Sequence, residues 1–338
     1  MANVTLKNVA ERAGVDVSTA SRALSADRSQ LVNPSTRRRV VEAAETLGYR
    51  ANVQASSLRR GRTGTVGVLV TDLSNPFIGP VLRGIANALG SKDLLPIMTE
   101  TRDSSDELAQ ICHKLLAQRV DGLITTAGRY QDRALLKRVA LEVPTVLAVR
   151  QLPDSGIPAI THDDVAGGRM AAEHLLALGH THLAQLMGPS DIWSFEGRGS
   201  GFRQAAIAAG ATCVDIESPL RLPTREAGVV LAQELLRRDG PPPTGVFAHN
   251  DTIAIGAIGA LRKGGLECPD DVSVVGYNDV PLTDQMRPPL TTIRLPGYQL
   301  GRLAAELIVA RIDGSETTTN AVVLAPEFIV RASTSPPR

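Results

Sequence analysis

Residues 5–24 constrain this chain most, because two short amphipathic segments flank a single glycine. Apolar residues recur at i, i+3 and i+4 on either side of Gly14, which is the spacing of helices that bury one face. A tight helix-to-helix turn requires a positive φ, and Gly14 reaches it without a Cβ clash. Asp16 or Ser18 can accept from the free amides that open the second helix. The stretch predicts a helix-turn-helix, whose second helix enters a DNA major groove, with a helical hairpin inside a larger domain as the alternative.

Charge is distributed unevenly along the chain, although the net charge of its 338 residues is only +1. Positions 1–62 carry 11 Lys and Arg against 5 acidic residues, and the remainder is mildly acidic. A basic segment on an acidic body predicts a polyanionic partner for that segment alone. With 43% hydrophobic residues, the chain is long enough for two or three domains and a sizeable core.

Several classes of protein are excluded by motifs that the sequence lacks. The three cysteines lie far apart and form no CxxC motif, so we expect neither a disulfide framework nor a metal site. No apolar signal segment or membrane-length run occurs, which predicts a cytoplasmic, nucleoid-associated protein with no membrane partner. GxSxG, P-loop and HExxH motifs are also absent, so we expect no enzyme and no cofactor.

A third helix and a basic linker complete the N-terminal region. Asn33 is a plausible N-cap, Pro34 suits the first helical position, and Gly48 ends the apolar stripe between them. Residues 52–58 look helical but are too few to form a stable helix alone. Residues 59–64 then read as a basic, flexible linker.

Beyond the linker the sequence alternates between short apolar strands and amphipathic helices. A continuous apolar run such as residues 66–70 indicates a strand that is covered on both faces. The expected strands lie at 66–70, 94–98, 122–126, 144–149, 183–188, 213–216, 245–249 and 272–277. The expected helices lie at 78–89, 105–118, 133–141, 165–178, 199–209, 225–237 and 251–264. This alternation predicts βαβ units in two similar halves, with a small-ligand cleft at the carboxyl ends of the strands.

Specific motifs run along nearly the whole chain. They are TLKNVAERAGVDVSTASRAL, VNPSTRRRVVEAAETLGYRAN, QASSLRRGRTGTVGVLVTDLSNPF, VDGLI, GRGSGF, FAHND, VSVVGYND and PPLTTI. Together they resemble the lactose-repressor (LacI/GalR) family of bacterial transcription regulators. The resemblance implies an all-α helix-turn-helix head and an α/β periplasmic-binding-protein-like body of two parallel-sheet sub-domains.

The resemblance also implies a domain layout. It places a DNA-binding domain at 1–50, a hinge helix and linker at 51–64, and an effector-binding and dimerisation domain at 65–338. Within the last, sub-domain one covers about 65–162 and 291–324, and sub-domain two about 163–290 and 325–338. We therefore expect a homodimeric, ligand-responsive regulator, a repressor, that binds a pseudo-palindromic operator. A solute-binding protein of the same fold is the alternative, but it would need an export signal and no DNA-binding head.

Residues that meet DNA follow from the same resemblance. Val17, Ser18 and Arg22 match base-reading positions, with simple packing as the alternative for Val17 and phosphate contact for Arg22. Thr19 and Ser21 match contacts to the DNA backbone. The remaining DNA-binding candidate in the head is Thr5.

The segment at 52–58 resembles the family's hinge helix, which folds in the minor groove when two subunits meet on the operator. Asn52 opens the segment, Ala55 would face the groove floor, and Leu58 would wedge between base steps. The alternative for Leu58 is a place in the core of the head. Ala51 and Ser56 depart from the family, which usually has proline and often a basic residue at these positions, so hinge formation is expected to be weaker.

Motif matches and strand-end positions together give the effector candidates. They are Asn75, Phe77, Arg150, Asp163, Trp193, Arg198, Asp251 and Asn278. Asp251 is alternatively a helix cap, Arg150 a surface ion pair and Trp193 loop packing. This donor and acceptor mixture suits vicinal hydroxyls, and only 3% of the chain is aromatic, so we expect a sugar or sugar derivative rather than a purine. Pro223 stands where the family often has a ring-bearing residue, which leaves the identity of the ligand open.

Overall fold

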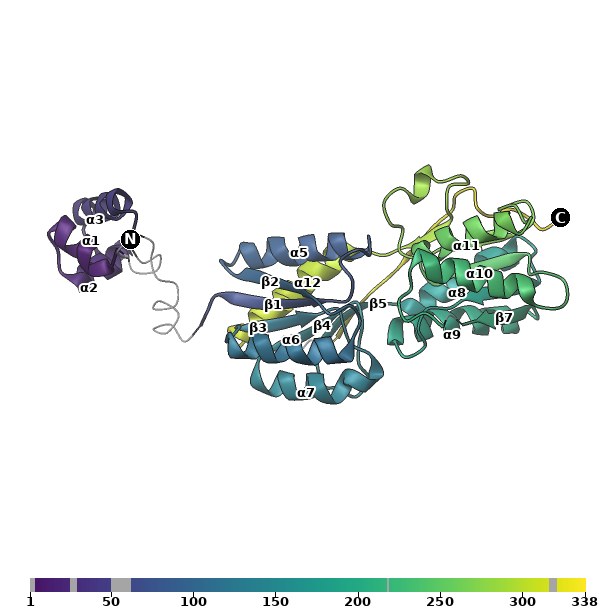
Figure 1. The fold of residues 1–338 in the computed structure, drawn as a ribbon, viewed down its shortest axis with the longest axis horizontal. Coiled ribbons are helices and arrows are strands. Elements are labelled where there is room, and N and C mark those ends of the chain that lie inside the picture. The colour runs from purple at the N-terminus through teal and green to yellow at the C-terminus, as the bar shows by residue number, and fades with distance from the viewer. Residues whose placement is uncertain (1–3, 25–28, 50–61, 218, 316–320) are drawn as a thin grey trace. The chain divides into compact units, whose positions relative to one another are not determined.

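The computed structural model describes residues 4–24, 29–49, 62–217, 219–315 and 321–338 (Figure 1). The chain forms two compact units, Met1–Thr63 and Gly64–Arg338. The first unit is helical, and the second contains two parallel sheets flanked by helices. The predicted fold class is therefore confirmed. No helix among the described residues has the length and apolar character needed to cross a bilayer.

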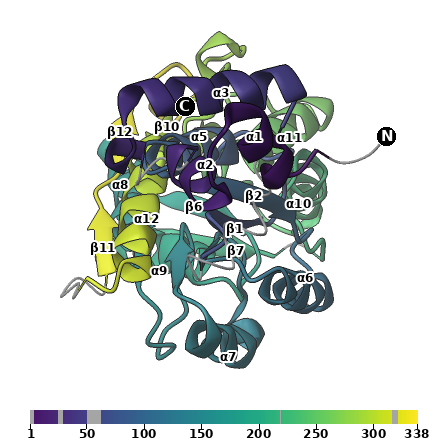
Figure 2. The same cartoon turned by 90° about the vertical axis from the view of Figure 1, so that its left-hand side faces the viewer.

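Three helices and one 3-10 turn build the N-terminal unit, called the head below. They are α1 (Leu6–Ala13), α2 (Val17–Ala23), η1 (Ser29–Leu31) and α3 (Pro34–Leu47). Figure 2 shows α3 lying across α1 and α2. The three helices share a core that includes Val9, Ala20 and Val40. Gly14 adopts a φ of 63° after α1, and Gly48 one of 64° after α3. Both predicted glycine turns are therefore present, because each helix ends at a residue with positive φ, which glycine adopts without a Cβ clash.

The second unit begins with a six-stranded parallel sheet, which we call lobe one together with its helices. Its order is β11-β5-β4-β3-β1-β2. The strands are β1 (Thr65–Val70), β2 (Leu95–Glu100), β3 (Gly122–Thr125), β4 (Thr145–Ala148), β5 (Ala159–His162) and β11 (Ala321–Leu324). The helices are α5 (Ile78–Gly90), α6 (Ser105–Ala117), α7 (Arg133–Glu142) and α12 (Gly297–Ile312), with a 3-10 turn η2 (Tyr130–Asp132). In Figure 1, α5 and α12 cover one face of the sheet, while α6 and α7 cover the other.

Lobe two contains a four-stranded parallel sheet in the order β7-β6-β8-β9. Its strands are β6 (His182–Leu186), β7 (Thr212–Ile216), β8 (Gly245–Ala248) and β9 (Ser273–Val275). Its helices are α8 (Asp164–Ala177), α9 (Trp193–Ala208), α10 (Arg225–Arg237) and α11 (Asp251–Lys263), with η3 (Thr283–Gln285) after β9. The chain crosses between the two lobes at β10 (Thr292–Arg294) and again at β12 (Glu327–Ile329), and these two strands pair antiparallel. One apolar cluster joins Val81 of lobe one to Phe202 of lobe two.

The strand β5 and the helix α9 are among the elements that differ from the expectation. The strand β5 was not anticipated, because its four residues follow a turn-rich segment and are followed by polar ones. The helix α9 begins at Trp193, six residues before the predicted start. The predicted start was too late because the glycines of GRGSGF have low helix propensity. Those glycines serve packing instead.

Glycines bring three pairs of helices into backbone contact. A Cβ on Gly168 of α8 would collide with the carbonyl oxygen of Arg198, and one on Gly201 of α9 with that of Val165. The same reciprocal arrangement joins α5 to α12 through Gly84 and Gly301, and α10 to α11 through Gly228 and Gly256. Larger side chains at these positions would push the helices apart.

We predict that Gly201→Ala lowers the free energy of unfolding by about 1–3 kcal/mol, because its Cβ meets backbone that cannot rotate away. The matched control is Gly259→Ala on α11, where an added Cβ meets nothing within 4 Å. The control should gain about 0.5–1 kcal/mol from the better helix former. Urea unfolding measures both variants, and equal effects would contradict the close-packing account.

Candidate functional site

The outer face of α2 presents the base-reading candidates to solvent. Ala20 and Ala23 are buried against the other helices of the head, which turns the opposite side outward. Val17 is 42% exposed, so it is not core packing. Arg22 folds back on Ser18, donating from Nε to the carbonyl oxygen (3.2 Å) and from Nη2 to Oγ (3.0 Å). Both side chains thus share one exposed polar surface.

The other DNA candidates lie on α2, at the start of α1 or outside the described residues. Thr5 is the N-cap of α1, where it forms a capping box with Asn8. Thr19 and Ser21 are half-buried on α2. The N-cap of α2 itself is Asp16, whose Oδ1 accepts from the amide of Ser18 at 2.7 Å. The hinge candidates Asn52, Ala55 and Leu58 lie outside the described residues.

A cavity of about 260 Å³ lies between the two lobes, at the carboxyl ends of several strands. Lobe one lines it with Thr71, Asp72, Ser74, Asn75, Phe77, Ile78, Thr126, Val149 and Arg150. Lobe two lines it with Ser194, Phe195, Arg198, Leu222, Pro223, Thr224, Arg225, Glu226, Asn250 and Thr252, and Asn278 precedes the crossing. Five predicted effector residues meet here: Asn75, Phe77, Arg150, Arg198 and Asn278.

Three predicted effector residues, Asp163, Trp193 and Asp251, are not part of the cavity lining. Asp251 is fully buried, and its carboxylate accepts from the Val280 amide (2.8 Å) and from Thr292 Oγ1 (2.6 Å). It does not cap α11 either, because Asn250 is the N-cap. Asp163 is the exposed N-cap of α8, and the 37% exposed Trp193 begins α9 beside the cavity lining rather than in it.

Arg198 is fixed in the lobe-two wall of the cavity. Its Nε donates to Asp164 Oδ1 at 2.8 Å, and its Nη1 donates to the carbonyl of His249 at 2.7 Å. The guanidinium also stacks between rings, with Cζ 3.9 Å from the Tyr277 centroid and 4.9 Å from that of Phe195. Burial raises the pKa of the Asp164 carboxyl, although Arg198 opposes this rise. These contacts hold the guanidinium in one orientation at the cavity.

Two further polar side chains face the cavity from other directions. Arg150 is buried, and its Nη1 donates to Asp103 Oδ1 at 2.6 Å. Arg150 therefore forms a buried ion pair and not a surface one. Asn278 is 8% exposed with a φ of 114°, and its Oδ1 is buried without a hydrogen-bond partner among the described residues. An unsatisfied buried acceptor is costly, so the Asn278 oxygen is available to a ligand hydroxyl.

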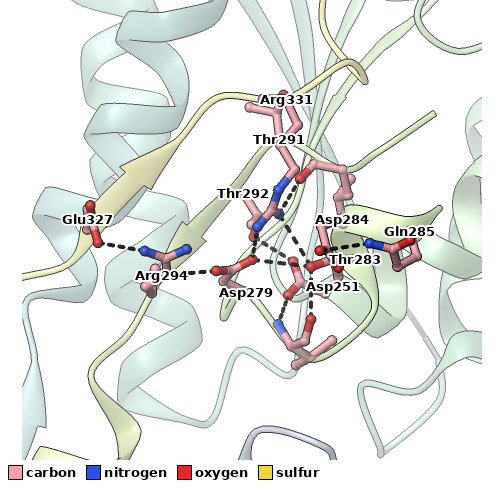
Figure 3. Close-up of polar contacts among 12 residues, drawn as sticks. Asp251, Asp279, Thr283, Asp284, Gln285, Thr291, Thr292, Arg294, Glu327 and Arg331 are labelled. Atoms are coloured by element: carbon pink, nitrogen blue, oxygen red, sulfur yellow. Dashed lines mark hydrogen bonds and ion pairs between the residues drawn. The ribbon is translucent and has the colours of Figure 1, made fainter. Parts of the chain in front are cut away.

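Asn278 bridges to the crossing strand at Arg294, and the residue after it, Asp279, belongs to the polar network drawn in Figure 3. Its amide donates to the carbonyl of Ile293 at 2.7 Å. The next residue, Asp279, accepts from Arg294 Nε and from Arg331 Nη2, each at 2.7 Å. Arg294 also reaches Glu327 at 3.1 Å. The crossing segments are therefore tied to one another beside the cavity.

Sequence reasoning missed several residues of the cavity. Phe195, two residues after Trp193 on α9, contributes an aromatic ring to the cavity lining. Asn250 and Thr252 line the lobe-two side, and both donate to the carbonyl of Pro223, at 2.8 and 2.9 Å. Asn250 lies two residues after the end of strand β8, so its strand-end position was the signal that could have identified it.

No group of three or more His, Cys, Asp or Glu side chains within the described ranges is arranged to hold a metal ion. The cavity chemistry is that of hydrogen bonding. Its lining combines the oriented guanidinium groups of Arg150 and Arg198 with amide and hydroxyl groups, and it also includes Arg225 and the carboxylates of Asp72 and Glu226, which suits a small polar molecule.

Known proteins share both the head and the body. The model of the bacterial regulatory proteins of the lacI family matches residues 5–52, and that of the periplasmic binding protein-like domain matches residues 172–334. The transcriptional regulator DegA of Bacillus subtilis is 32% identical over 98% of both chains. A lac repressor dimer bound to operator and the anti-inducer ONPF matches with a TM-score of 0.87 at 27% identity, covering 99% of this chain and 100% of its own. A complex of the transcriptional regulator CelR with cellobiose matches with a TM-score of 0.73 at 31% identity, covering 98% and 99%.

We predict that acid destabilises the walls of the cavity through buried histidines. Burial lowers the pKa of His162 to about 3 and that of His249 well below its ordinary value. Because the unfolded side chain takes up a proton near pH 6.5 and the folded one does not, stability is lost as the pH falls below 6.5. Between pH 6.5 and 5 the proton uptake of unfolded His162 should cost about 1–2 kcal/mol of stability, and His249 should act in the same direction.

Urea unfolding across this pH range checks the prediction. His162→Leu should show a shallower loss of stability than the wild type, whereas His113→Gln on the exposed side of α6 should not. An unchanged slope in His162→Leu would refute the assignment.

Proposed function

Because this chain belongs to the lacI family of bacterial regulatory proteins and is a DNA-binding transcription regulator, we propose that it represses its target genes under the control of a small molecule. The observation that carries the proposal is an exposed recognition face on one unit and a polar interlobe cavity on the other. Within a cell the protein acts at the nucleoid, in the cytoplasm. A solute-binding role is disfavoured by the helix-turn-helix head, which such a role does not use.

The α2 face reads an operator in the major groove. Arg22 leaves Ser18 and makes a bidentate contact to a guanine, while Val17 meets a thymine methyl group. Ser18 donates to or accepts from a base, and Thr19 and Ser21 contact phosphates. The N-terminal end of α1, with Thr5, faces the backbone in the same way.

Two chains bind together on a pseudo-palindromic site. The lac repressor that this chain resembles over nearly its full length is a dimer on its operator, and a two-fold dimer requires two related half-sites. We place the DNA-binding domain at 1–50, the hinge at 51–64 and the effector-binding and dimerisation domain at 65–338. The hinge residues Asn52, Ala55 and Leu58 enter the minor groove at the centre of the operator, where Leu58 kinks the duplex.

The effector is a sugar or sugar derivative bound between the lobes. Arg150 and Arg198 donate to hydroxyl oxygens, and the Asn278 oxygen accepts from a hydroxyl hydrogen. A purine favours more stacking surface than this cavity provides, where the aromatic lining consists of Phe77 and Phe195. The cellobiose complex of the similar CelR supports a carbohydrate.

We predict that Arg22→Ala relaxes base preference at one position of each half-site, at a cost of about 1–3 kcal/mol for the preferred sequence. Selection of random DNA by the wild type yields the operator, and fluorescence anisotropy on single-base variants measures the change. Lys7→Ala serves as the control, because Lys7 is an exposed cation on α1 and not on α2. An asymmetric selected site, or unchanged base preference in Arg22→Ala, would contradict the proposal.

We predict that Arg198→Met lowers effector affinity at least about tenfold, because a hydrogen bond from a charged group is lost, and leaves operator affinity unchanged. A thermal-shift screen of neutral sugars and nucleobases identifies the ligand, and calorimetry compares the variants. Arg203→Met on the same helix is the control, because Arg203 pairs with Asp215 and does not line the cavity. Equal ligand affinity in the two variants, or a nucleobase as the only ligand, would count against this site.

A further inference from the structure

A carboxylate outside the cavity lining binds two arginines at once. Asp103 follows β2 in a left-handed conformation (φ 54°), and its side chain is only 2% exposed. Its Oδ1 accepts from Arg150 Nη1 and its Oδ2 from Arg129 Nη2, both at 2.6 Å. Burial alone would raise the pKa of Asp103, but the two arginines outweigh it, so the pKa lies below its ordinary value. The carboxylate is therefore charged and fully engaged.

One of these arginines reaches across to lobe two. Arg129 Nη1 forms an ion pair with Asp191, and its Nη2 also donates to the carbonyl of Arg221 at 3.1 Å. Arg221 returns the contact, because its Nε donates to the carbonyl of Asp103 at 3.0 Å.

Tyr130 adds two further bridges beside Arg129. Its amide donates to the carbonyl of Asp191 at 3.1 Å, and its hydroxyl hydrogen-bonds to Glu196. We call Arg129 and Tyr130, with Asp191, Glu196 and Arg221 of lobe two, the interlobe clasp.

The other arginine belongs to the cavity. Arg150 lines it, and the ion pair that the structure records for its guanidinium is the one with Asp103. Among the described residues, Arg150 is therefore connected to the clasp by the carboxylate of Asp103, which binds both Arg150 and Arg129. A ligand atom that accepts a hydrogen bond from the Arg150 guanidinium competes with Asp103 for that donor. If Asp103 moves as a result, its hydrogen bond to Arg129 changes as well.

We propose that Asp103 is a positioning residue that couples the cavity to the interlobe clasp, so that the contacts of Arg150 set how firmly the two lobes are held together. The meaning of the coupling for gene control rests on the proposed function, but the coupling itself exists in the free protein. Loss of the Asp103 charge leaves Arg129 and Arg150 buried without their shared partner, which weakens the clasp. Loss of Arg150 loosens Asp103 and weakens the clasp from a distance.

Hydrogen exchange at the Tyr130 amide tests this proposal in the full-length protein without DNA or effector, because that amide bonds across the lobes. Exchange should rise about tenfold in Asp103→Asn, the scale of one charged hydrogen bond. Arg150→Met should raise it at least about threefold, although Arg150 lies on the cavity side of Asp103. In the double variant Arg150→Met should add nothing, because the path is already broken.

Asp215→Asn is the matched control, because it removes a carboxylate that pairs with an arginine inside lobe two alone. Exchange at Tyr130 should be unchanged in it, and amides of the lobe-one sheet should be unchanged in every variant. If Asp103→Asn does not fold, Arg150→Met carries the test alone. Unchanged exchange at Tyr130 in Arg150→Met, or additive effects in the double variant, would overturn the coupling. Failure of the proposed function would appear separately, as a wild-type protein that selects no operator and binds no sugar.

Discussion

The buried pairing of Arg198 with Asp164 is the interaction on which the cavity depends. It forms because glycines let α8 and α9 touch through their backbones, which brings the start of α8 within hydrogen-bond distance of Arg198. Tyr277, at the end of lobe two's sheet, donates to the same carboxylate oxygen at 3.1 Å. A charged pair this deep is tolerated because both members are hydrogen-bonded. The pair thereby fixes one cavity wall and the start of the crossing in a single cluster.

The periodic parts of the fold could be predicted from the sequence. Apolar runs of four to six residues, alternating with amphipathic helices, indicate a buried parallel sheet whatever the details of packing. The helix-turn-helix was equally readable, because Gly14 and Gly48 stand where a left-handed residue is required. Helix α9 was placed too late because a glycine has the same low helix propensity whether it ends a helix or lets another helix approach.

The direction of individual side chains could not be predicted in the same way. Asp251 and Asn278 both follow strand ends, yet one is sealed by Thr292 and the other faces the cavity. The difference arises from the chain that crosses between the lobes, which covers Asp251 and belongs to no local pattern. Arg150 lines the cavity, but its partner Asp103 lies 47 residues away in sequence and no spacing rule connects them. Polar partners that are distant in the sequence could therefore not be predicted from the sequence alone.

The central claim is that the interlobe cavity and the DNA-binding head belong to one thermodynamic system. Two pairs of measurements test it most directly. The operator affinity is measured with and without the sugar that the thermal-shift screen identifies, and the affinity for that sugar is measured with and without operator. Linkage requires the two ratios to be equal, and we predict a common factor of roughly 5–150. A ratio of one in both directions would show that the cavity does not control the head, and would contradict the account.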